Sequence, residues 1–400
     1  AKPTTAPAAQ PTPAAKVPTT PIKLGYLTPL VGVFAGLGGD LRDGFLLFFE
    51  EKGNTVAGRK IEIITEDTEG KPDVGLTKAK KLVERDGVKL LAGIISSGVA
   101  PGVARYATEQ KVPLLITNAG ADALTKQAAT PYVFRSSFSN SQNTHVVGEW
   151  AYKKGYRKAI IIGADYGAGW DHAGGFADTF TQAGGRVIQE IWPPLGNPDF
   201  APFITTIKTD ADVLFNFAPD ADALLFVKQY TEFGLKGKIP VVGGWLTTEN
   251  IIQQEGDAAL GIVNGYPFAA TGDRPQTKAF VEAFKKRFNK DASPQAEFGY
   301  SGAMVVAKAL EAVGGNIEDT EAFIKAMEKV ELEAPRGPIK FDKYRGVVND
   351  MYITEVKKVD GKLVNAVVDK VVGVTQFWKW SPEDFLKKTP YAELKGKWVK

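Results

Sequence analysis

The chain has 400 residues, of which 44% are hydrophobic and 24% charged, a composition that excludes collagen-like, wholly disordered and disulfide-scaffold proteins. Its 49 Lys and Arg residues against 46 Asp and Glu residues give a formal net charge of +3, too near neutral to indicate nucleic-acid binding. The sequence has no cysteine and only two histidines. Thiol catalysis, disulfides and thiolate metal sites are therefore excluded, and imidazole chemistry has few candidates.

Residues 1–21 consist almost entirely of Ala, Pro and Thr. Such a segment cannot bury enough apolar surface to offset the entropy lost on ordering, so we predict a disordered tether at 1–21. We interpret it as the start of a mature chain whose signal peptide has been removed, because no intact secretory signal is present. A disordered arm on a cytoplasmic protein is the alternative. No apolar run approaches the roughly 18 to 20 residues of a membrane span.

After residue 21, short β-branched runs alternate with amphipathic segments of helical length, a pattern typical of βα units around a parallel sheet. The first series predicts strands at 22–28, 60–66, 90–95 and 113–117, and helices at 40–52, 72–86 and 99–110. In the first of these helices, Leu41, Phe45 and Phe48 form one apolar stripe, and Asp40 is an N-cap type of residue.

A second series of the same kind begins near residue 141. It predicts strands at 158–163, 186–192, 213–217, 239–242 and 261–266, and helices at 141–154, 170–183, 200–208 and 221–233. Three further helices, at 275–288, 295–313 and 320–330, precede two strands at 351–359 and 364–372. Two tandem series of strands and helices predict an α/β protein with two lobes.

The late helices have no strands between them and are poorly suited to begin a third sheet. We expect them to pack on the first lobe and the last two strands to complete the second, so that the chain crosses between the lobes three times. The predicted N-terminal lobe is 22–138 plus 268–349, and the predicted C-terminal lobe is 139–267 plus 350–400. This layout leaves a crevice at the carboxyl ends of both sets of strands, which is where we expect a ligand to bind.

The sequence offers little recognisable catalytic machinery. The segment GLGGDLRDG has glycines at Gly36 and Gly38, but Leu41 stands where the third fingerprint glycine belongs, so a glycine-rich crevice turn is favoured over a dinucleotide site. No phosphate loop and no GxSxG elbow occur, and His145 and His172 are too far apart to form a helical metal pair. His172 is either a crevice donor or a packing residue. We predict a protein that is not an enzyme and uses no metal or cofactor.

Two loops of the first lobe are more informative. In GIISSGVAPGVA, Ser96 and Ser97 stand between a predicted strand and a predicted helix, where hydroxyls and helix N-terminal amides can converge on an anion or simply cap the helix. In LLITNAGADALT, residues 117–122 end a strand with small and polar residues that allow close approach of a ligand. We interpret the pair as a cradle for a small molecule.

Three loops of the second lobe, ADYGAGWDHAGG, FNFAPDADA and GGWLTTEN, also follow predicted strands. They carry Tyr166, Trp170, Phe217 and Trp245 at positions that would otherwise face solvent. Aromatic side chains at converging loops usually cover something, which favours ligand contact. Packing between the lobes is the alternative.

At these loops the sequence resembles the branched-chain amino-acid (Leu/Ile/Val-binding) receptors, type I periplasmic binding proteins that deliver solutes to ABC importers. The resemblance covers residues 21–372. It is carried, in order, by IKLGYLTPLVGVFAGLGGDLRDGF, EDTEGKPDVGLTKAKKLV, GIISSGVAPGVA, PLLITNAGADALT, YVFRSSFSN, DYGAGW and GDAALGIVNGYPF. It implies two Rossmann-like lobes joined by a three-crossover hinge. It also implies a periplasmic monomer that binds no nucleic acid and docks on the membrane permease subunits of an ABC importer.

The resemblance also assigns roles to individual positions. Ser96 or Ser97, together with the loop 119–122, matches the positions that hold the carboxylate of amino-acid ligands. Tyr166 matches the crevice tyrosine of the second lobe, and the turn 34–38 matches the loop that touches the body of the ligand. The expected ligand-binding residues are Phe34, Leu37, Ser96, Ser97, Gly98, Asn118, Ala119, Gly120, Ala121, Tyr166, Trp170, Phe217, Asp220 and Trp245.

The chain departs from the amino-acid receptors at GGWLTT, where Trp245 stands near the position of the acidic residue that binds the ligand ammonium. An ammonium buried without an anion costs several kcal/mol, so an α-amino acid is disfavoured unless Asp220 substitutes for the missing acid. An aromatic residue suits a carboxylate with an apolar ring, whose burial contributes roughly 1.5 to 3 kcal/mol, with about 0.5 to 1.5 more from ring geometry.

This pattern, and the segment TQFWKWSPEDFLKK near the C-terminus, resemble the aromatic-acid branch of the same receptors. The expected ligand is therefore a benzoate-, phenylpropenoate- or arylketo-acid-like carboxylate. The alternatives are a branched-chain or other amino acid, a ligand-sensing module built on the same fold, and an enzyme that uses crevice carboxylates on a sugar or an amide. The last is disfavoured because no nucleophile or metal constellation is recognisable.

Overall fold

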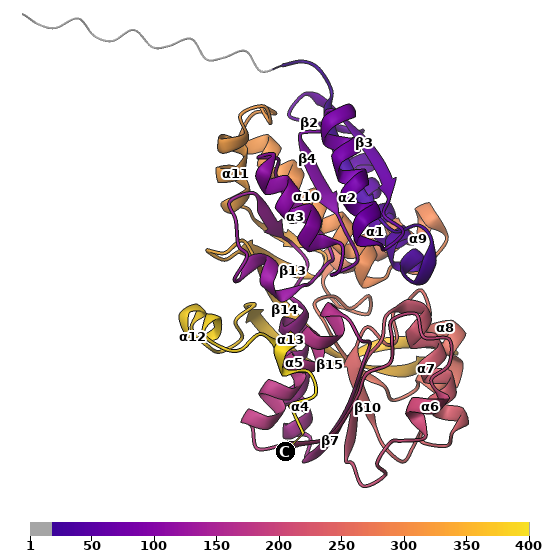
Figure 1. The fold of residues 1–400 in the computed structure, drawn as a ribbon. Helices are drawn as coiled ribbons and strands as arrows, with labels where there is room; N and C mark the ends of the chain where they lie inside the picture. Colours follow the sequence, from indigo (N-terminus) through magenta and orange to yellow (C-terminus); the bar gives the residue numbers. More distant parts are fainter. Residues whose placement is uncertain (1–17, 400) are drawn as a thin grey trace, which may run out of the picture.

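The computed structural model describes residues 18–399 and divides the chain into two α/β lobes (Figure 1). Most of the predicted tether, residues 1–17, lies outside the described residues. No helix among residues 18–399 combines the length and the apolar character that a membrane crossing requires. The two-lobe α/β architecture predicted from the sequence is confirmed.

The first lobe is built on a six-stranded sheet in the order β2-β3-β1-β4-β5-β6. All neighbouring strands are parallel except β2, which pairs antiparallel with β3. The strands are β1 (Ile22–Thr28), β2 (Thr55–Val56), β3 (Arg59–Asp67), β4 (Leu90–Gly93), β5 (Leu114–Ile116) and β6 (Val133–Arg135). Strand β1 is buried on both faces except at Lys23, because helices cover the sheet from both sides.

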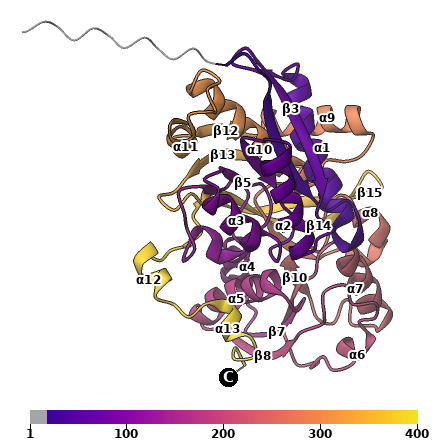
Figure 2. The ribbon, with the colours of Figure 1, turned by 45° about the horizontal axis from the view of Figure 1, so that its top comes forward.

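Helices from two distant parts of the chain cover this sheet. They are η1 (Gly32–Phe34), α1 (Ala35–Glu51), α2 (Pro72–Lys80), η2 (Lys81–Arg85), α3 (Ala100–Glu109), η3 (Asp122–Thr125), α9 (Pro275–Phe288), α10 (Pro294–Ala312) and α11 (Thr320–Glu328). One face packs against α1 and α10, and the other against α2 and α3, which lie side by side (Figure 2). The late helices thus pack on the first lobe, as predicted.

Glycines allow α1 and α10 to approach closely. A Cβ atom on Gly44 of α1 would lie 1.8 Å from the carbonyl oxygen of Ala296, and one on Gly299 of α10 would lie 2.0 Å from that of Leu41. Any side chain at either glycine would therefore force the helices apart. This close packing fixes the start of α10 beside the start of α1 at the cleft.

The second lobe has a parallel core in the order β8-β7-β9-β10-β11. Its strands are β7 (Lys158–Gly163), β8 (Arg186–Ile191), β9 (Val213–Phe217), β10 (Val241–Gly244) and β11 (Val263–Tyr266). The late strands β14 (Val347–Val359) and β15 (Lys362–Val374) extend it antiparallel from β11, as predicted. Its helices are α4 (Asn140–Lys153), α5 (Gly167–Gln182), α6 (Ala201–Ile204), α7 (Asp220–Glu232), α8 (Ile252–Glu255) and η4 (Gly256–Ala259).

Four strands were not predicted: β2 and β6 of the first sheet, and the hairpin strands β12 (Glu331–Ala334) and β13 (Gly337–Phe341). The boundaries predicted from the sequence placed the β12–β13 hairpin in the N-terminal lobe. In the structure, β13 pairs with β14 and so joins the second sheet. At the same time, β12 packs against α9 and α10 of the first lobe. This β12–β13 hairpin therefore belongs to the hinge, where the chain makes the last of three passages between the lobes (Figure 1).

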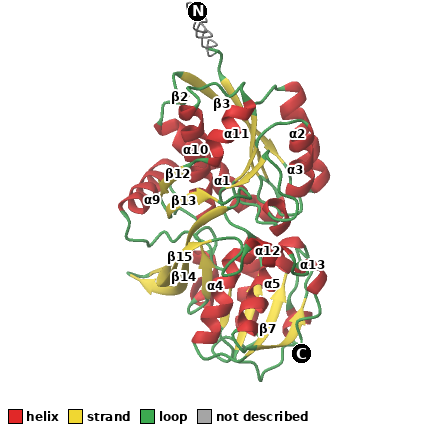
Figure 3. Ribbon diagram, turned by 90° about the vertical axis from the view of Figure 1, so that its left-hand side faces the viewer, coloured by secondary structure: helices red, strands yellow, loops and turns green. Residues whose placement is uncertain are grey.

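The C-terminal segment 375–399 packs on the second lobe, with α12 (Pro382–Leu386) and α13 (Tyr391–Leu394); α13 lies beside α5 (Figure 3). The hydroxyl of Tyr391 hydrogen-bonds Nε2 of His145 at 3.0 Å and donates to Asp178 at 2.8 Å. The segment also reaches the first lobe, because Nζ of Lys126 lies 4.2 Å from the centre of the Phe385 ring. It therefore bridges the two lobes beside the cleft.

Candidate ligand-binding cavity between the lobes

A small cavity lies between the lobes, where loops from the carboxyl ends of both sheets meet. Its lining residues are Phe34, Leu37, Ile95, Ser97, Asn118, Gly120, Phe138, Asn140, Tyr166, Ala168, His172, Phe217, Pro219, Trp245 and Gln295. Its volume of about 30 Å³ is room for one or two water molecules. The walls from the two lobes are therefore nearly in contact.

Three loops of the first sheet supply most of the first-lobe wall. Phe34 and Leu37 follow β1 at the start of α1, Ser97 follows β4, and Asn118 and Gly120 follow β5. All five residues stand beyond the carboxyl ends of parallel strands. This is the edge at which ligands bind in open α/β sheets.

The second-lobe wall is aromatic. Tyr166 follows β7, Phe217 ends β9 and Trp245 follows β10. Trp245 is only 4% exposed and has a φ of +69°, a left-handed conformation that is costly for a residue with a side chain. Such strain persists where the surrounding structure enforces it, and it is common at ligand sites. The fold thus holds the Trp245 ring in the cavity wall.

The rings form a continuous arc around the cavity. Phe217 stacks on His172 with ring centres 4.1 Å apart, and Trp245 lies 4.9 Å from Phe138. Across the cleft, the ring centres of Phe34 and Tyr166 are 6.4 Å apart. These spacings are typical of favourable aromatic pairs.

His172 positions Trp245 within this arc. Its Nδ1 lies 2.8 Å from the carbonyl oxygen of Ala168, and the indole Nε1–H of Trp245 donates to its Nε2 at 3.0 Å. Burial lowers the pKa of His172 to about 4, so the ring is neutral near pH 7 and Nε2 can accept. The sequence left the role of His172 open, and the structure places it in the cavity wall with both nitrogens engaged.

Hydrogen-bond donors collect at the Ser97 side of the cavity. Asn140 Nδ2 donates to Oγ of Ser97 at 3.2 Å, which leaves the Ser97 hydroxyl hydrogen free to bond a ligand. Within residues 18–399, the backbone N–H groups of Ser97 and Gly120 donate to no other group. This arrangement suits a carboxylate held by neutral donors.

Two carboxylates of the second lobe contact the first lobe directly. Asp171 accepts hydrogen bonds from the backbone N–H of Asp122 at 3.0 Å and from Asn140 Nδ2 at 3.2 Å. Asp220 accepts from the backbone of Gly36 at the start of α1, and a Cβ on that glycine would lie 2.9 Å from the carboxylate. The glycine-rich segment, which the sequence predicted as a crevice turn, is thus the first part of helix α1, and its Gly36 is a contact between the lobes.

The fourteen predicted site residues fall into three groups. Eight line the cavity: Phe34, Leu37, Ser97, Asn118, Gly120, Tyr166, Phe217 and Trp245. Two others, Ala121 and Trp170, line a neighbouring cavity of about 300 Å³, which Ser97 also lines. Four line neither of the two: Ser96, Gly98, Ala119 and Asp220.

The positions of these last four have local causes. Oγ of Ser96 accepts from the backbone N–H of Gly98 at 3.2 Å, so this serine caps the turn before α3. The N–H of Ala119 bonds the carbonyl oxygen of Ile94. The Asp220 carboxylate is occupied by Asn250 Nδ2 at 2.7 Å and by the start of α1.

The sequence did not indicate six of the lining residues, namely Ile95, Phe138, Asn140, Ala168, Pro219 and Gln295, as ligand contacts, and it left the role of His172 open. Phe138 and Asn140 lie in the first crossover, and Ala168 and His172 in the first turns of α5. Gln295 opens α10, far along the chain from the loops that carry the other polar groups. Only the three-dimensional packing of α10 beside α1 brings it to the cavity.

No Asp or Glu occurs among the cavity-lining residues of the described chain. The acid closest in sequence to Trp245 is Glu249, whose Oε1 accepts from Asn365 at 3.0 Å outside the cavity. Asp171 does not line this cavity, but it accepts a hydrogen bond from the lining residue Asn140 and lines the neighbouring cavity that Ser97 shares. Residues 18–399 also hold no group of three or more His, Asp or Glu side chains placed to bind a metal ion.

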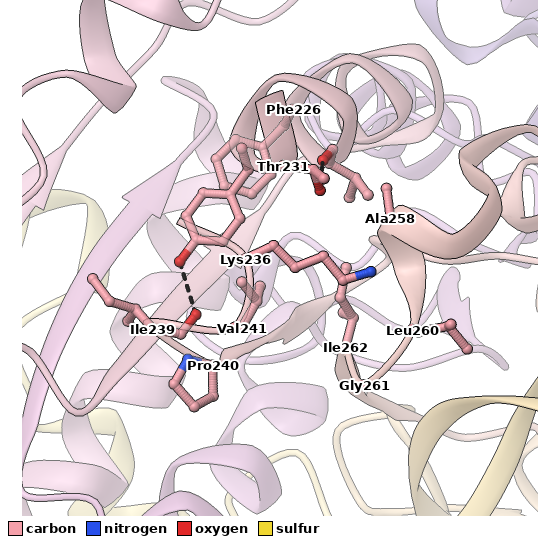
Figure 4. Close-up of a pocket in the computed structure, with 13 residues that line it drawn as sticks. Phe226, Thr231, Lys236, Ile239, Pro240, Val241, Ala258, Leu260, Gly261 and Ile262 are labelled. Carbon is pink, nitrogen blue, oxygen red and sulfur yellow. Dashed lines mark hydrogen bonds between the residues drawn. The ribbon is translucent and has the colours of Figure 1, made fainter. Parts of the chain in front are cut away.

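A larger pocket of about 560 Å³ lies on the second lobe away from the cleft (Figure 4). Its walls come from α7, the segment before β10 and the residues that precede β11. The hydroxyl of Tyr230 is occupied by the carbonyl oxygen of Ile239 at 2.8 Å, and Lys236 is the one charged residue of this lining. Among the described residues, none from the first lobe lines this pocket. It therefore lacks the two-lobe contact of the central cavity.

The interlobe carboxylate Asp171 gives a testable pH dependence. Burial, followed by the charge of Asp122, raises the pKa of Asp171 from 3.8 to about 7. The folded protein therefore binds a proton that the unfolded chain lacks between these pH values, and the free energy of unfolding falls as pH rises through this window. Asp171→Asn keeps the hydrogen-bond acceptor and removes the titration. We expect a weaker fall between pH 5 and pH 7 in urea titrations of this variant.

The pH dependence of the variant must be compared with that of wild-type protein, because burial also raises the pKa of Glu249 to about 7 and that of Glu255 to about 8. These acids contribute a slope of the same sign to both proteins, so the difference between the two slopes isolates Asp171. Identical slopes would show that Asp171 carries no shifted pKa.

Comparison with known proteins bears directly on this two-lobe cavity. A family model described as periplasmic binding protein matches residues 21–362. The Leu/Ile/Val-binding protein homolog 6 of Brucella suis is 33% identical over 85% of this chain and 88% of its own length. Among solved structures, a solute-binding protein of an ABC transporter from Rhodopseudomonas palustris BisB5, in complex with 3,4-dihydroxybenzoic acid, is 36% identical with a TM-score of 0.84. The match covers 88% of this chain and 98% of the other.

A second solute-binding protein of an ABC transporter, from Rhodopseudomonas palustris HaA2 in complex with p-hydroxybenzoic acid, is 32% identical with a TM-score of 0.85. The match covers 89% of this chain and 98% of the other. The family model spans both lobes, and the relatives cover the same region at more than 30% identity. The chain therefore belongs to the periplasmic binding protein family and is a solute-binding protein of the ABC transporter type.

Proposed function

We propose that this protein is an extracytoplasmic receptor that binds a small aromatic carboxylate between its lobes and delivers it to the membrane permease subunits of an ABC importer. The ligand class is benzoate-, phenylpropenoate- or arylketo-acid-like. The receptor acts as a monomer and carries out no catalysis. The observation that supports this ligand class most strongly is a cavity walled by aromatic rings and lined by no acidic side chain.

The ring of the ligand is matched by the aromatic wall. Tyr166, Phe217 and Trp245 of the second lobe face Phe34 and Phe138 across the cavity. An α-amino acid would bring an ammonium into the same space without an anionic partner, at a cost of several kcal/mol. An aromatic acid brings no such charge.

The carboxylate is matched by the donors on the Ser97 side. The Ser97 hydroxyl and the free backbone N–H groups of Ser97 and Gly120 belong to loops after β4 and β5, where ligands approach parallel sheets. Asn140 supports this group by holding Oγ of Ser97. The carboxylate would thus bind to the first lobe while the ring packs on the second.

Contact with both lobes couples binding to closure. A ligand shifts the equilibrium toward the closed form by its differential affinity for that form. Because the cavity holds only about 30 Å³, the lobes must part before a ring-sized ligand enters. The permease would then recognise the form that has closed again around the ligand.

The comparisons favour two ligand classes. The two Rhodopseudomonas palustris structures are described as complexes with hydroxylated benzoic acids, which supports an aromatic carboxylate. The Brucella suis relative is named for Leu, Ile and Val, which supports an amino acid as the second candidate. In that case Asp220 or Asp171 would have to turn toward the cavity to pair with the ammonium. A ligand-sensing module would use the same cavity but a signalling partner in place of the permease.

Ser97→Ala tests the carboxylate position. Loss of a hydrogen bond to a charged group costs about 1.5 to 3 kcal/mol, so we expect roughly 10- to 150-fold weaker binding of an aromatic carboxylate by calorimetry. The neighbouring Ser96→Ala is a matched control, because Ser96 caps the turn and lines neither cavity. Equal affinities in the two variants would remove Ser97 from the site.

The ligand class is tested by thermal unfolding of protein stripped of carried-over ligand. A panel of benzoates, arylpropenoates, arylketo acids and amino acids is added, and the shift of the midpoint is recorded. A ligand that binds only the folded protein stabilises it by about 2.7 kcal/mol at one hundred times its dissociation constant. Shifts with aromatic acids and none with leucine or valine support the proposal. Shifts with amino acids alone would overturn it.

A further inference from the structure

The cavity contains a polar side chain that the protein itself leaves unsatisfied. Gln295 is the second residue of α10 and is only 1% exposed. Its Oε1 has no hydrogen-bond partner among the described residues, although the side chain lines the cavity. Leaving a buried amide oxygen unpaired is costly, and such groups in folded proteins are normally satisfied by protein, water or ligand.

The fold brings Gln295 to the cavity from a different direction than Ser97. Ser97 leads into α3, which covers one face of the first sheet, whereas Gln295 opens α10, which covers the opposite face with α1. Trp245 lies 6.0 Å from Phe298, one turn further along α10. Gln295 therefore reaches the cavity from α10, on the face of the first sheet opposite to the helix that follows Ser97.

The chemistry of an unpaired amide oxygen selects its partner. Oε1 can only accept, so a ligand carboxylate, which also only accepts, cannot satisfy it. A hydroxyl or an ammonium can donate to it, but an ammonium would be buried against a neutral acceptor with no anion in the lining. A ring hydroxyl donates without carrying a charge.

We propose that Gln295 is a specificity-determining residue that accepts a hydrogen bond from a ring hydroxyl, so that the ligand is a hydroxylated aromatic carboxylate. This inference rests on the proposed function, because it assumes that the cavity holds an aromatic acid. It adds the group that the ring carries and the residue that recognises it. The ligand is then held by its carboxylate on the Ser97 side and by its hydroxyl at α10.

A second unpaired acceptor lies nearby, but it is a poorer subject for mutation. Oδ1 of Asn118 is buried without a partner, while its Nδ2 donates to the carbonyl oxygen of Ile95 at 3.2 Å. That bond joins the loops after β4 and β5, so a substitution would disturb the carboxylate side as well. Within residues 18–399 the side chain of Gln295 makes no hydrogen bond, so its replacement leaves the other loops intact.

The test is calorimetric binding to wild-type protein and to Gln295→Leu, which keeps the approximate side-chain size and removes the amide. The ligands are benzoate, the three hydroxybenzoates and the three matching methylbenzoates, so that each hydroxyl is compared with a methyl group at the same ring position. We expect wild-type protein to bind at least one hydroxybenzoate about tenfold more tightly than its methyl counterpart, the effect of one hydrogen bond. Gln295→Leu should remove this preference and bind benzoate as well as wild-type protein does.

Gln110→Leu serves as the matched control, because this glutamine is exposed at the end of α3. It should retain the full hydroxyl preference. The thermal midpoint of ligand-free Gln295→Leu should not fall, since replacing an unpaired buried amide by an apolar group removes a cost.

The outcomes separate this inference from the proposed function. If wild-type protein binds benzoate but shows no preference for any hydroxyl, or if Gln295→Leu keeps that preference, the role of Gln295 is wrong and the aromatic-acid receptor stands. If no benzoate of the panel binds to wild-type protein, the proposed function is wrong and this inference fails with it.

Discussion

Replacing Trp245 with alanine is expected to weaken binding of an aromatic carboxylate by roughly 30- to 150-fold. The indole packs against Phe138 at 4.9 Å and is oriented by its hydrogen bond to His172. Loss of this wall removes apolar burial and ring contacts worth about 2 to 3 kcal/mol in total, and each 1.4 kcal/mol is a tenfold change in affinity. Isothermal titration calorimetry on the stripped protein measures the effect.

Trp245→Phe separates the ring from the hydrogen bond, because it keeps an aromatic wall and loses the donor to His172. We expect its affinity to fall between those of wild-type protein and the alanine variant. Trp150→Ala on α4, outside the cavity, should leave the affinity unchanged. An unaltered dissociation constant in Trp245→Ala would remove this residue from the site.

Truncating Glu297 to alanine should destabilise the folded protein by about 3 to 5 kcal/mol, the usual cost of breaking a buried ion pair. Glu297 of α10 and Arg336 of the β12–β13 turn are fully buried, with Nη1 of the arginine 2.8 Å from the carboxylate. The same guanidinium donates to Ser301 Oγ at 3.1 Å and to the carbonyl oxygen of Ser136 in the first crossover. Without the carboxylate, a buried positive charge at the hinge loses its anion.

The free energy of unfolding in urea measures this effect. Replacing both partners, as Glu297→Leu with Arg336→Met, should restore most of the lost stability, because no buried charge then remains. Glu383→Ala breaks the exposed pair with Lys343 and should change stability by less than about 1 kcal/mol. Equal losses from Glu297→Ala and Glu383→Ala would contradict the role of the buried pair.

The architecture could be predicted from the sequence because local signals agreed with the final packing. Strands 22–28, 158–163 and 213–217 were predicted with the bounds that the structure shows, since each is an apolar run buried on both faces of a parallel sheet. The helix 275–288 likewise begins at Pro275 and ends before the left-handed Asn289. The two lobes and the order of the crossovers followed from these elements.

Elements governed by distant contacts were missed. The strands β12 and β13 are short and form a hairpin beside the hinge, where tertiary packing rather than a long apolar run specifies them. The predicted helix 200–208 is reduced to Ala201–Ile204, a single turn around Pro202. The predicted boundary placed β12 and β13 in the N-terminal lobe by their order in the chain, which does not reveal that β13 pairs with β14 of the other sheet.

In the candidate site, too, local sequence signals predicted some residues, and those placed by distant contacts were missed. Ser97, Tyr166 and Trp245 could be placed at the crevice because residues that follow parallel strands meet at one edge of a sheet. That rule cannot distinguish Ser96, which caps a turn, from Ser97, which lines the cavity. The rule also does not apply to Gln295, because this residue lies in the first turn of helix α10 and does not follow a strand.

Direct measurement of binding tests the central claim. Calorimetric titration of the stripped protein with 4-hydroxybenzoate and, in parallel, with leucine compares the two ligand classes on one sample. The aromatic wall and the absence of an acid in the lining predict saturable one-to-one binding of the hydroxybenzoate and no detectable heat with leucine. Tight binding of leucine with none of the aromatic acid would contradict the proposal that this receptor binds aromatic carboxylates.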